Sequence, residues 1–240
     1  MEKKIKLGAL ISGGGTNLQA ILDSCIENKI DATMLFTGSD NNSAKGLKRA
    51  EKAGIATFIV DYSAIIQNVK ADPDRVELPH DFDLEEVKSK QKLFSNTMDK
   101  EKIDHFLQSR AIAEKQLLDH MLAYDIDLLV LAGFMRTLTP YFIDKFCAFQ
   151  TRKIMNIHPA LLPSFPGTDG YGDTFKYGCK VGGCTVHYID YGEDTGPIIG
   201  QKAYTIEDND TLEDIKKKGL ELEWQLFPEC IQKFAESRKN

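Results

Sequence analysis

"KIKLGALISGGGTNLQAILDSCIEN", residues 4–28, is the stretch of sequence from which the expected fold follows. The continuous apolar run over 4–11 predicts a buried β-strand, and apolar residues at helical spacing over 16–28 predict an amphipathic α-helix. Three consecutive glycines join the two segments, which is typical of a tight turn. A buried strand that leads straight into a helix is the repeating part of sheets in which parallel strands alternate with helices.

The same alternation of strand and helix patterns continues to about residue 160. Further strands are expected at 32–38, 55–61, 126–134 and 153–157, and helices at 43–54, 115–125 and 142–146. Strands that are apolar throughout, separated by helices, indicate a mostly parallel sheet with helices on both faces. After residue 180, two strand patterns flank the turn "YGEDT", which predicts an antiparallel hairpin. The final helix is expected to have Thr211 as its N-cap, with Asp214 completing a capping box.

The predicted fold class is therefore α/β, with a twisted, mostly parallel sheet and a C-terminal antiparallel hairpin in one domain over 1–240. Residues 62–100 interrupt the pattern because they are charged, contain two prolines and show no clear periodicity. A long irregular segment in a compact domain is commonly a lid, a surface embellishment or a partly disordered stretch. We predict a charged insert there, with all three interpretations open.

Composition narrows the possible functions. With 42% hydrophobic and 28% charged residues, the 240-residue chain is typical of globular proteins. The net charge of −6 argues against nucleic acid or an anionic membrane as the main partner. No apolar run approaches the roughly 18 residues of a membrane-spanning helix, and the run near the N-terminus is too short for a signal peptide.

The five cysteines are odd in number, scattered, and include no C-x-x-C pair. These features predict reduced thiols in a cytoplasmic protein. Cys179, Cys184 and His187 are an alternative set of metal ligands, but a second ligand pair is missing. We therefore expect no metal.

Four polar segments are expected at one edge of the sheet, because each follows a predicted strand or joins two of them. They are "SGGGTN" (12–17), "GFMR" (133–136), "NIHP" (156–159) and the hairpin turn that contains Asp194. In open parallel sheets, ligands bind beyond the carboxyl ends of the strands. The ligand site is therefore expected among these segments.

The glycine-rich turn has the features of an anion site. Its backbone N–H groups are accessible, and the following helix adds positive potential at its N-terminus. Thr16 and Asn17 add side-chain donors, whereas Leu18 stands where the dinucleotide fingerprint has a third glycine, and the P-loop lysine is absent. The turn predicts a cradle for one phosphate; a tight turn without a ligand is the alternative.

Asn156 and His158 lie two residues apart at a predicted strand end, so both side chains leave the same face. An amide N–H can stabilise a developing oxyanion, and an imidazole can exchange a proton near neutral pH. The carboxylate of Asp194 is suited to fix the tautomer of the imidazole. Spacing alone does not link the two, and purely structural roles are the alternative. His187 is expected to be a half-buried sheet residue near the site, and Trp224 a core residue.

Five motifs in this order resemble the folate-dependent formyltransferase family, most closely its members that act on glycinamide ribonucleotide. They are "LISGGGTNLQAI", "LAGFMRTLTP", "NIHPALLPSFPG", "GCTVHYIDYGEDTGPII" and "EWQLFP". The resemblance covers nearly the whole chain apart from the insert. It implies a Rossmann-like formyltransferase fold and the transfer of a formyl group from 10-formyltetrahydrofolate to the amine of glycinamide ribonucleotide in de novo purine biosynthesis. It also implies two small-molecule partners, no nucleic acid or membrane, no metal, and a monomer or homodimer.

The resemblance further implies roles for individual residues. The catalytic residues would be Asn156, His158 and Asp194. The residues that bind the substrate phosphate would be Gly15, Thr16 and Asn17, and Glu223 would reach its ribose hydroxyls. The residues around the folate would be Met135, Arg136, Leu138, Ile189, Asp190 and Asp194. A cis peptide bond before Pro163 is also implied.

Two segments depart from the family pattern. After "FPG", a helix start that contains histidines in relatives is replaced by "GTDGYGDTFKYG" (167–178), where Gly170 or Tyr171 is the candidate replacement. The insert covers the region of a usual arginine contact to folate, for which Arg110 is the candidate.

Other functions within this fold are alternatives. Formyltetrahydrofolate deformylase shares the catalytic residues but has an additional N-terminal domain, whereas the first strand here begins just after Met1. Methionyl-tRNA formyltransferase needs an RNA-binding domain and a basic surface. Sugar-nucleotide formyltransferases usually lack "SGGGTN", and a noncatalytic binding module would tolerate changes among the catalytic residues.

Overall fold

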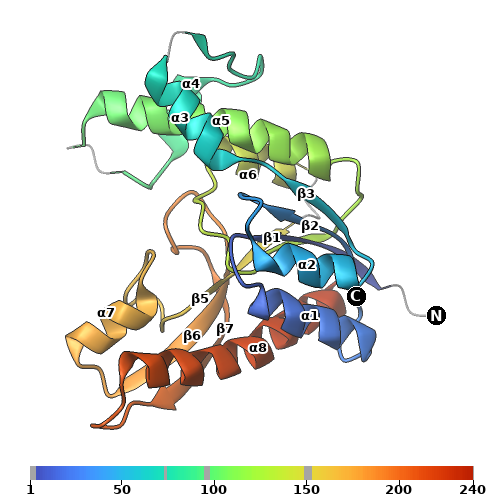
Figure 1. Ribbon diagram of the computed structural model, residues 1–240, viewed down its shortest axis with the longest axis vertical. Helices are drawn as coiled ribbons and strands as arrows, with labels where there is room; N and C mark the ends of the chain where they lie inside the picture. The colour runs from blue at the N-terminus through green and yellow to red at the C-terminus, as the bar shows by residue number, and fades with distance from the viewer. Residues whose placement is uncertain (1–3, 73–74, 95–97, 149–152, 240) are drawn as a thin grey trace.

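Strands and helices alternate along the chain in the computed structural model, which describes residues 4–72, 75–94, 98–148 and 153–239 (Figure 1). The strands are β1 (Ile5–Ile11), β2 (Ala32–Ser39), β3 (Ala56–Ile59), β4 (Leu128–Leu131), β5 (Lys153–His158), β6 (Val181–Tyr188) and β7 (Ile198–Thr205). The helices are α1 (Thr16–Ile26), α2 (Lys45–Lys52), α3 (Tyr62–Ala71), α4 (Leu84–Lys90), α5 (Lys100–Met121), α6 (Pro140–Cys147), α7 (Gly170–Tyr177) and α8 (Leu212–Ser237).

The described strands form one sheet in the order β3-β2-β1-β4-β5-β6-β7. The first five of these pair in parallel, whereas β5 with β6 and β6 with β7 pair antiparallel. The prediction of a mostly parallel sheet that ends in a C-terminal hairpin is confirmed. The chain reverses its direction of travel across the sheet between β1 and β4, and this switch point is where open α/β sheets bind ligands.

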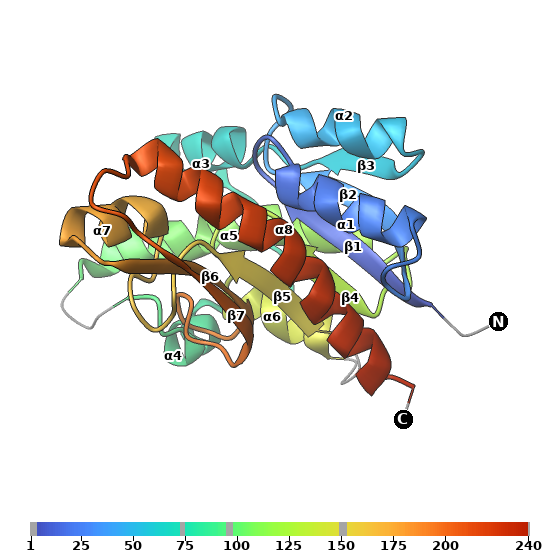
Figure 2. The same cartoon turned by 90° about the horizontal axis from the view of Figure 1, so that it is seen from below.

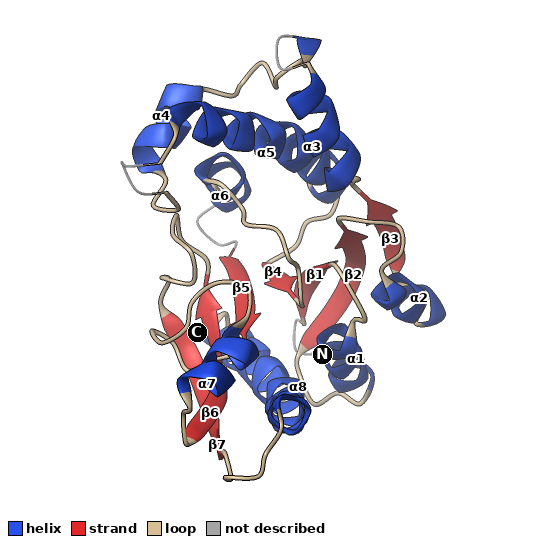
Figure 3. Ribbon diagram, turned by 60° about the vertical axis from the view of Figure 1, so that its left-hand side comes forward, coloured by secondary structure: helices blue, strands red, loops and turns tan. Residues whose placement is uncertain are grey.

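Helices cover both faces of the sheet because its central strands are apolar on both sides. Along β1, Leu7 and Ile11 pack with α1, α2 and α8, whereas Leu10 packs on the opposite face with α3, α5 and α6. Successive side chains of a strand point to opposite faces, so a continuously apolar strand must be buried on both. Figure 3 shows the sheet between the two helical layers, and Figure 2 shows α8 crossing β5, β6 and β7.

The prediction of an irregular insert at 62–100 is wrong for much of its length. It contains α3 and α4, and α5 begins where it ends. Asp61, Asp83 and Asp99 cap these three helices by accepting hydrogen bonds from backbone N–H groups. Tyr62 of α3 is fully buried, and α3 packs along α5. The segment is therefore part of a helical layer, and its capping aspartates were the sequence signal for it; residues 73–74 and 95–97 lie outside the described residues.

The last helix has the predicted capping box, in which Thr211 and Asp214 exchange side-chain and backbone hydrogen bonds. The prediction that Trp224 is a core residue is wrong, because its side chain is 39% exposed. The buried face of α8 passes through Gly219, Glu223 and Phe227, which are four residues apart and therefore aligned on one face. Trp224 follows Glu223 directly and is not among the buried residues of α8.

A buried carboxyl group joins α5 to the start of α6. Glu114 is fully buried, and its oxygens accept hydrogen bonds from the backbone N–H of Thr139 at 2.7 Å and its hydroxyl at 2.6 Å. Thr139 is the N-cap residue of α6. Burial raises the pKa of Glu114 from 4.5 to about 7, although the Thr139 hydrogen bonds and the Arg110 charge oppose the shift.

A Glu114→Gln variant is expected to be more stable than the wild type at alkaline pH. Because the pKa is raised in the folded state, the folded protein binds more protons than the unfolded chain between pH 4.5 and about 7, so wild-type stability falls as pH rises through this window. Glutamine can accept from the Thr139 N–H through Oε1 and donate to the Thr139 hydroxyl through Nε2 without a charge, so its stability advantage should be small at pH 4 and grow to on the order of 3 kcal/mol at pH 8. Urea unfolding at both pH values measures it.

The control for this experiment is Glu51→Gln on the exposed face of α2, which should show no such pH dependence. An advantage of Glu114→Gln that is equal at both pH values would contradict the expectation.

Candidate active site

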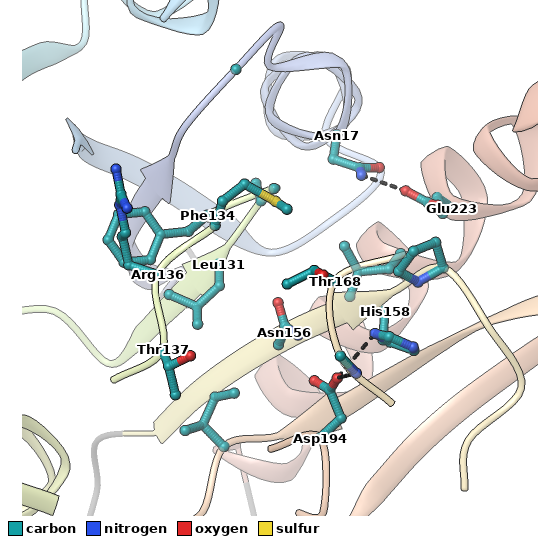
Figure 4. A pocket seen from close by; sticks show the side chains of 18 of the residues that line it. Asn17, Leu131, Phe134, Arg136, Thr137, Asn156, His158, Thr168, Asp194 and Glu223 are labelled. Carbon is teal, nitrogen blue, oxygen red and sulfur yellow. Dashed lines mark hydrogen bonds and ion pairs between the residues drawn. The ribbon is translucent and has the colours of Figure 1, made fainter. Parts of the chain in front are cut away.

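A pocket opens at the carboxyl ends of β1, β4 and β5 (Figure 4). All four segments expected at this edge line it: the glycine-rich turn after β1, the loop after β4, the end of β5 and the turn that contains Asp194. The glycine-rich turn is more than a hundred residues from the other three segments in the chain. The parallel sheet brings them together because its strand ends share one edge.

The glycine-rich turn leads into α1 in a conformation that exposes backbone donors. Gly15, the N-cap residue, has φ 70°, and a Cβ there would lie 2.6 Å from Cα of Gly46. No side chain caps this end of α1, so the N–H groups of its first turn are available to a ligand. Gly13 to Asn17 line the pocket. The arrangement is that of an anion site at a helix N-terminus.

Asn156 and His158 project from the end of β5 into the same pocket. His158 is 3% exposed, and its Nδ1 lies 3.2 Å from Oδ2 of Asp194. Its Nε2 lies 2.7 Å from the carbonyl oxygen of Phe165. Both ring nitrogens thus face oxygen acceptors, and only an imidazolium can donate a hydrogen bond to both.

Asp194 is held as a charged group beside His158. Oδ2 also accepts a hydrogen bond from the backbone N–H of Gly167 at 2.9 Å, and Oδ1 lies 3.4 Å from Nε2 of His187. Burial favours the neutral carboxyl, but the hydrogen bond from His187, the charge of His158 and the Gly167 N–H outweigh it. The pKa of Asp194 therefore lies below its usual value of 3.8.

The proline-rich segment after β5 supplies partners to both groups. The carbonyl of Phe165 faces His158, and the N–H of Gly167 binds Asp194. The segment is anchored to the sheet because Leu162 donates to the hydroxyl of Thr185 at 3.0 Å. The expected cis bond before Pro163 is present. The stiff segment thus fixes the positions of the imidazole and the carboxylate.

The prediction that His187 is half-buried is wrong, because it is 0% exposed. It sits opposite Asn156 in the antiparallel pairing of β5 with β6. Its Nδ1 lies 3.0 Å from the carbonyl of Tyr188 and its Nε2 lies 3.2 Å from Nδ2 of Asn156. Nε2 also lies 3.4 Å from Oδ1 of Asp194, so this ring nitrogen stands between the amide of Asn156 and the carboxylate of Asp194.

The far end of the pocket is lined by Asn17, Tyr171 and Glu223. Nδ2 of Asn17 donates to Oε2 of Glu223 at 2.6 Å, and the hydroxyl of Tyr171 donates to Oε1. Burial raises the pKa of Glu223 above its usual value, and the two hydrogen bonds oppose that shift.

Comparison with known proteins connects this geometry to a family. The sequence profile of the family described as formyl transferase matches residues 5–231. The chain belongs to the formyl transferase family. It is 31% identical to phosphoribosylglycinamide formyltransferase of Bacillus subtilis, over 95% of this chain and 93% of that protein. It is 33% identical to the protein of the same name from Haemophilus influenzae, over 97% of this chain and 88% of that protein.

The structure of this formyl transferase family member also resembles solved structures. Glycinamide ribonucleotide transformylase 1 from Symbiobacterium toebii superposes with a TM-score of 0.75 and 35% sequence identity. The match covers 99% of this chain and 91% of that one. The predicted α/β formyltransferase fold is confirmed.

The folate candidates are not all at the pocket. Met135, Arg136, Leu138 and Ile189 line it, whereas Asp190 is not among the lining residues. Asp190 instead accepts hydrogen bonds within its own turn, from Gly192 N–H at 3.1 Å and the hydroxyl of Thr195 at 2.7 Å. Arg136 donates to Oδ2 of Asp40 at 2.6 Å.

Arg110, the other folate candidate, lies outside the pocket lining. It is 7% exposed, and its guanidinium lies over the ring of Phe106 at 4.4 Å. In the described part of the chain, no three His, Cys, Asp or Glu residues are grouped to hold a metal ion. All five cysteines are free thiols. None of the described helices is both long and apolar enough to cross a bilayer.

Proposed function

We propose that this protein transfers a formyl group from 10-formyltetrahydrofolate to the amine of glycinamide ribonucleotide, giving formylglycinamide ribonucleotide and tetrahydrofolate in de novo purine biosynthesis. The observation that carries the proposal is the convergence of Asn156, His158 and Asp194 beside an anion cradle in one pocket. Membership of the formyl transferase family and the names of the relatives support the same reaction.

The two substrates would enter from opposite ends of the pocket. The N–H groups of Gly15 and Thr16, with Asn17, would bind the phosphate, and Glu223 would accept hydrogen bonds from ribose hydroxyls. Met135, Arg136, Leu138 and Ile189 would line the folate subsite. The amine and the formyl carbon would then meet beside Asn156 and His158. Holding two reactants in this geometry removes much of the entropic barrier to their reaction.

The chemistry needs stabilisation of one developing negative charge. The amine attacks the formyl carbon, which leaves an oxyanion on the former carbonyl oxygen and an ammonium on the attacking nitrogen. The amide of Asn156 would donate to the oxyanion, and the imidazolium of His158, paired with Asp194, would add positive charge. The surplus proton passes through water to N10 of the folate as the bond from carbon to N10 breaks. The N10 nitrogen thereby leaves as a neutral amine.

The proposed partners are the two small molecules, with no part for a nucleic acid, a membrane or a metal. We propose a cytoplasmic location, which the free thiols of this chain suit because disulfides rarely persist in that compartment. The chain is proposed to act as a monomer or homodimer.

Purified protein is expected to release tetrahydrofolate only when 10-formyltetrahydrofolate and glycinamide ribonucleotide are both present, with one formylated product per folate released. Absorbance of the folate together with mass spectrometry of the ribonucleotide measures both products. Folate release without the amine would identify a deformylase instead, and binding without release a noncatalytic module.

A further inference from the structure

One corner of the pocket contains hydrogen-bond acceptors that can each take a further donor. Glu223 of α8 and Asn17 of α1 are 4% and 7% exposed, and each Glu223 oxygen already accepts one hydrogen bond, from Tyr171 or from Asn17. A carboxylate oxygen has two acceptor sites, so each can take one more donor. The Oδ1 atom of Asn17 is buried and has no hydrogen-bond partner among the residues that the structure describes.

A ligand that satisfies this corner must bring donors. Buried polar atoms without partners are costly, and vicinal hydroxyl groups of a sugar would satisfy Glu223 and Oδ1 of Asn17 together. The corner adjoins the anion cradle at Gly15, since Asn17 belongs to both. A phosphate in the cradle and hydroxyls in the corner are the two ends of a sugar phosphate.

Tyr171 reaches this corner because α8 lacks a side chain beneath its ring. A Cβ on Gly219 would lie 2.3 Å from Cε1 of Tyr171. Gly219 and Glu223 are one turn apart on the same face of α8. The ring therefore rests on the backbone of α8, and its hydroxyl is delivered to Oε1 of the carboxylate one turn further along the helix.

We propose that Tyr171 is a positioning residue that fixes the Glu223 carboxylate as the acceptor of a sugar hydroxyl and thereby selects ribonucleotides over their deoxy analogues. This inference rests on the proposed function, whose substrate carries the sugar phosphate. The Tyr171 hydroxyl uses one acceptor site of Oε1 and limits rotation of the carboxylate. The remaining acceptor sites are then held at fixed positions for the substrate.

The decisive variant is Tyr171→Phe, which keeps the ring on α8 and removes only the hydroxyl. KM for glycinamide ribonucleotide is expected to rise about tenfold, because one charge-assisted hydrogen bond no longer holds the acceptor. The kcat value and KM for the folate should stay within about twofold, since the reacting atoms would meet beside Asn156 and His158, away from this corner. The preference of the enzyme for the ribonucleotide over its 2′- and 3′-deoxy analogues should shrink by a similar factor.

The pH profile gives a second readout that a merely structural role would not change. Without the tyrosine hydroxyl, one of the two hydrogen bonds that oppose the raised pKa of Glu223 is lost. The carboxylate then protonates at higher pH, so the acid limb of kcat/KM for the ribonucleotide should move to higher pH. Cys184 and Tyr204 also face this carboxylate, but burial raises the pKa of both side chains, so they stay neutral across that range.

The control is Tyr177→Phe, which removes a hydroxyl from the same helix on a side chain that is 79% exposed. It should leave both KM values and the acid limb unchanged. In a double-mutant cycle, Tyr171→Phe should have little further effect once Glu223→Gln is present. An unchanged KM, or undiminished discrimination against the deoxy analogues, overturns the role of Tyr171 while wild-type transfer continues. Failure of the wild-type protein to formylate glycinamide ribonucleotide would instead overturn the proposed function and this inference with it.

Discussion

An Asp194→Asn variant is expected to lose at least about a hundredfold in kcat, the scale of losing one electrostatic contribution to an oxyanion. Asparagine has the size of aspartate, and it tolerates the φ of 53° found at this position better than most residues. Its oxygen can still accept from Gly167 and His158. The variant therefore chiefly removes the negative charge that stabilises the imidazolium, together with the hydrogen bond that Oδ1 accepts from His187.

The melting temperature should fall by no more than about 4 °C, because no cavity and no strained backbone is created. The matched control is Asp208→Asn, which removes an exposed carboxylate that pairs with Lys180 and should leave kcat unchanged. A loss of stability that accounts for the loss of activity would point to a structural role for Asp194.

The same variant tests the lowered pKa of Asp194. Because that pKa lies below 3.8, the carboxylate is charged throughout the neutral range. The wild type should have a higher free energy of unfolding than Asp194→Asn. This stability advantage should be constant above about pH 5 and shrink only as pH falls through the lowered pKa. An advantage that disappears between pH 6 and 7 would contradict the charged state that the structure indicates.

Asn156→Ala is expected to lower kcat by about a hundred- to a thousandfold. It removes the amide side chain that lines the pocket beside His158 and would donate to the oxyanion. KM values should change much less, because the interaction with the oxyanion exists only in the transition state. The substitution also removes the amide group that lies 3.2 Å from Nε2 of His187. Steady-state kinetics with both substrates and a thermal melt measure these effects.

The control for this variant is Asn68→Ala on the exposed face of α3, which should retain full activity. An equal rise in KM with unchanged kcat would show that Asn156 binds the ground state of a substrate and has no part in stabilising the oxyanion.

Local sequence patterns were sufficient for most of the architecture. The apolar run of β1 and the glycine turn before α1 predicted a strand, a turn and a helix in the places where they occur. The capping box of α8 was also visible in the sequence. The insert was misjudged because α3 and α4 are short and mostly exposed, which leaves too few apolar positions for a periodicity to emerge.

From the sequence, the candidate site was predictable only for residues that follow directly after predicted strands. Motifs placed Asn156, His158, the glycine turn and the turn with Asp194 at one edge of the sheet, and similarity to a family supplied the link between Asp194 and His158. Nothing local indicated that His187 would face Asn156, because that contact depends on the register between β5 and β6. Nothing local placed Tyr171 on Glu223, because that contact depends on how α7 packs on α8.

The sequence by itself therefore determined most of the strands and helices and which polar residues follow the strands, since these depend on periodicity and capping among near neighbours. Tertiary structure alone decided that the carboxylate of Asp194 lies between two histidines, that His187 is buried beneath the site and that Tyr171 holds Glu223. The physical reason is that each of these contacts joins residues far apart in the chain. A shift of one residue in strand pairing would turn such a side chain to the opposite face of the sheet.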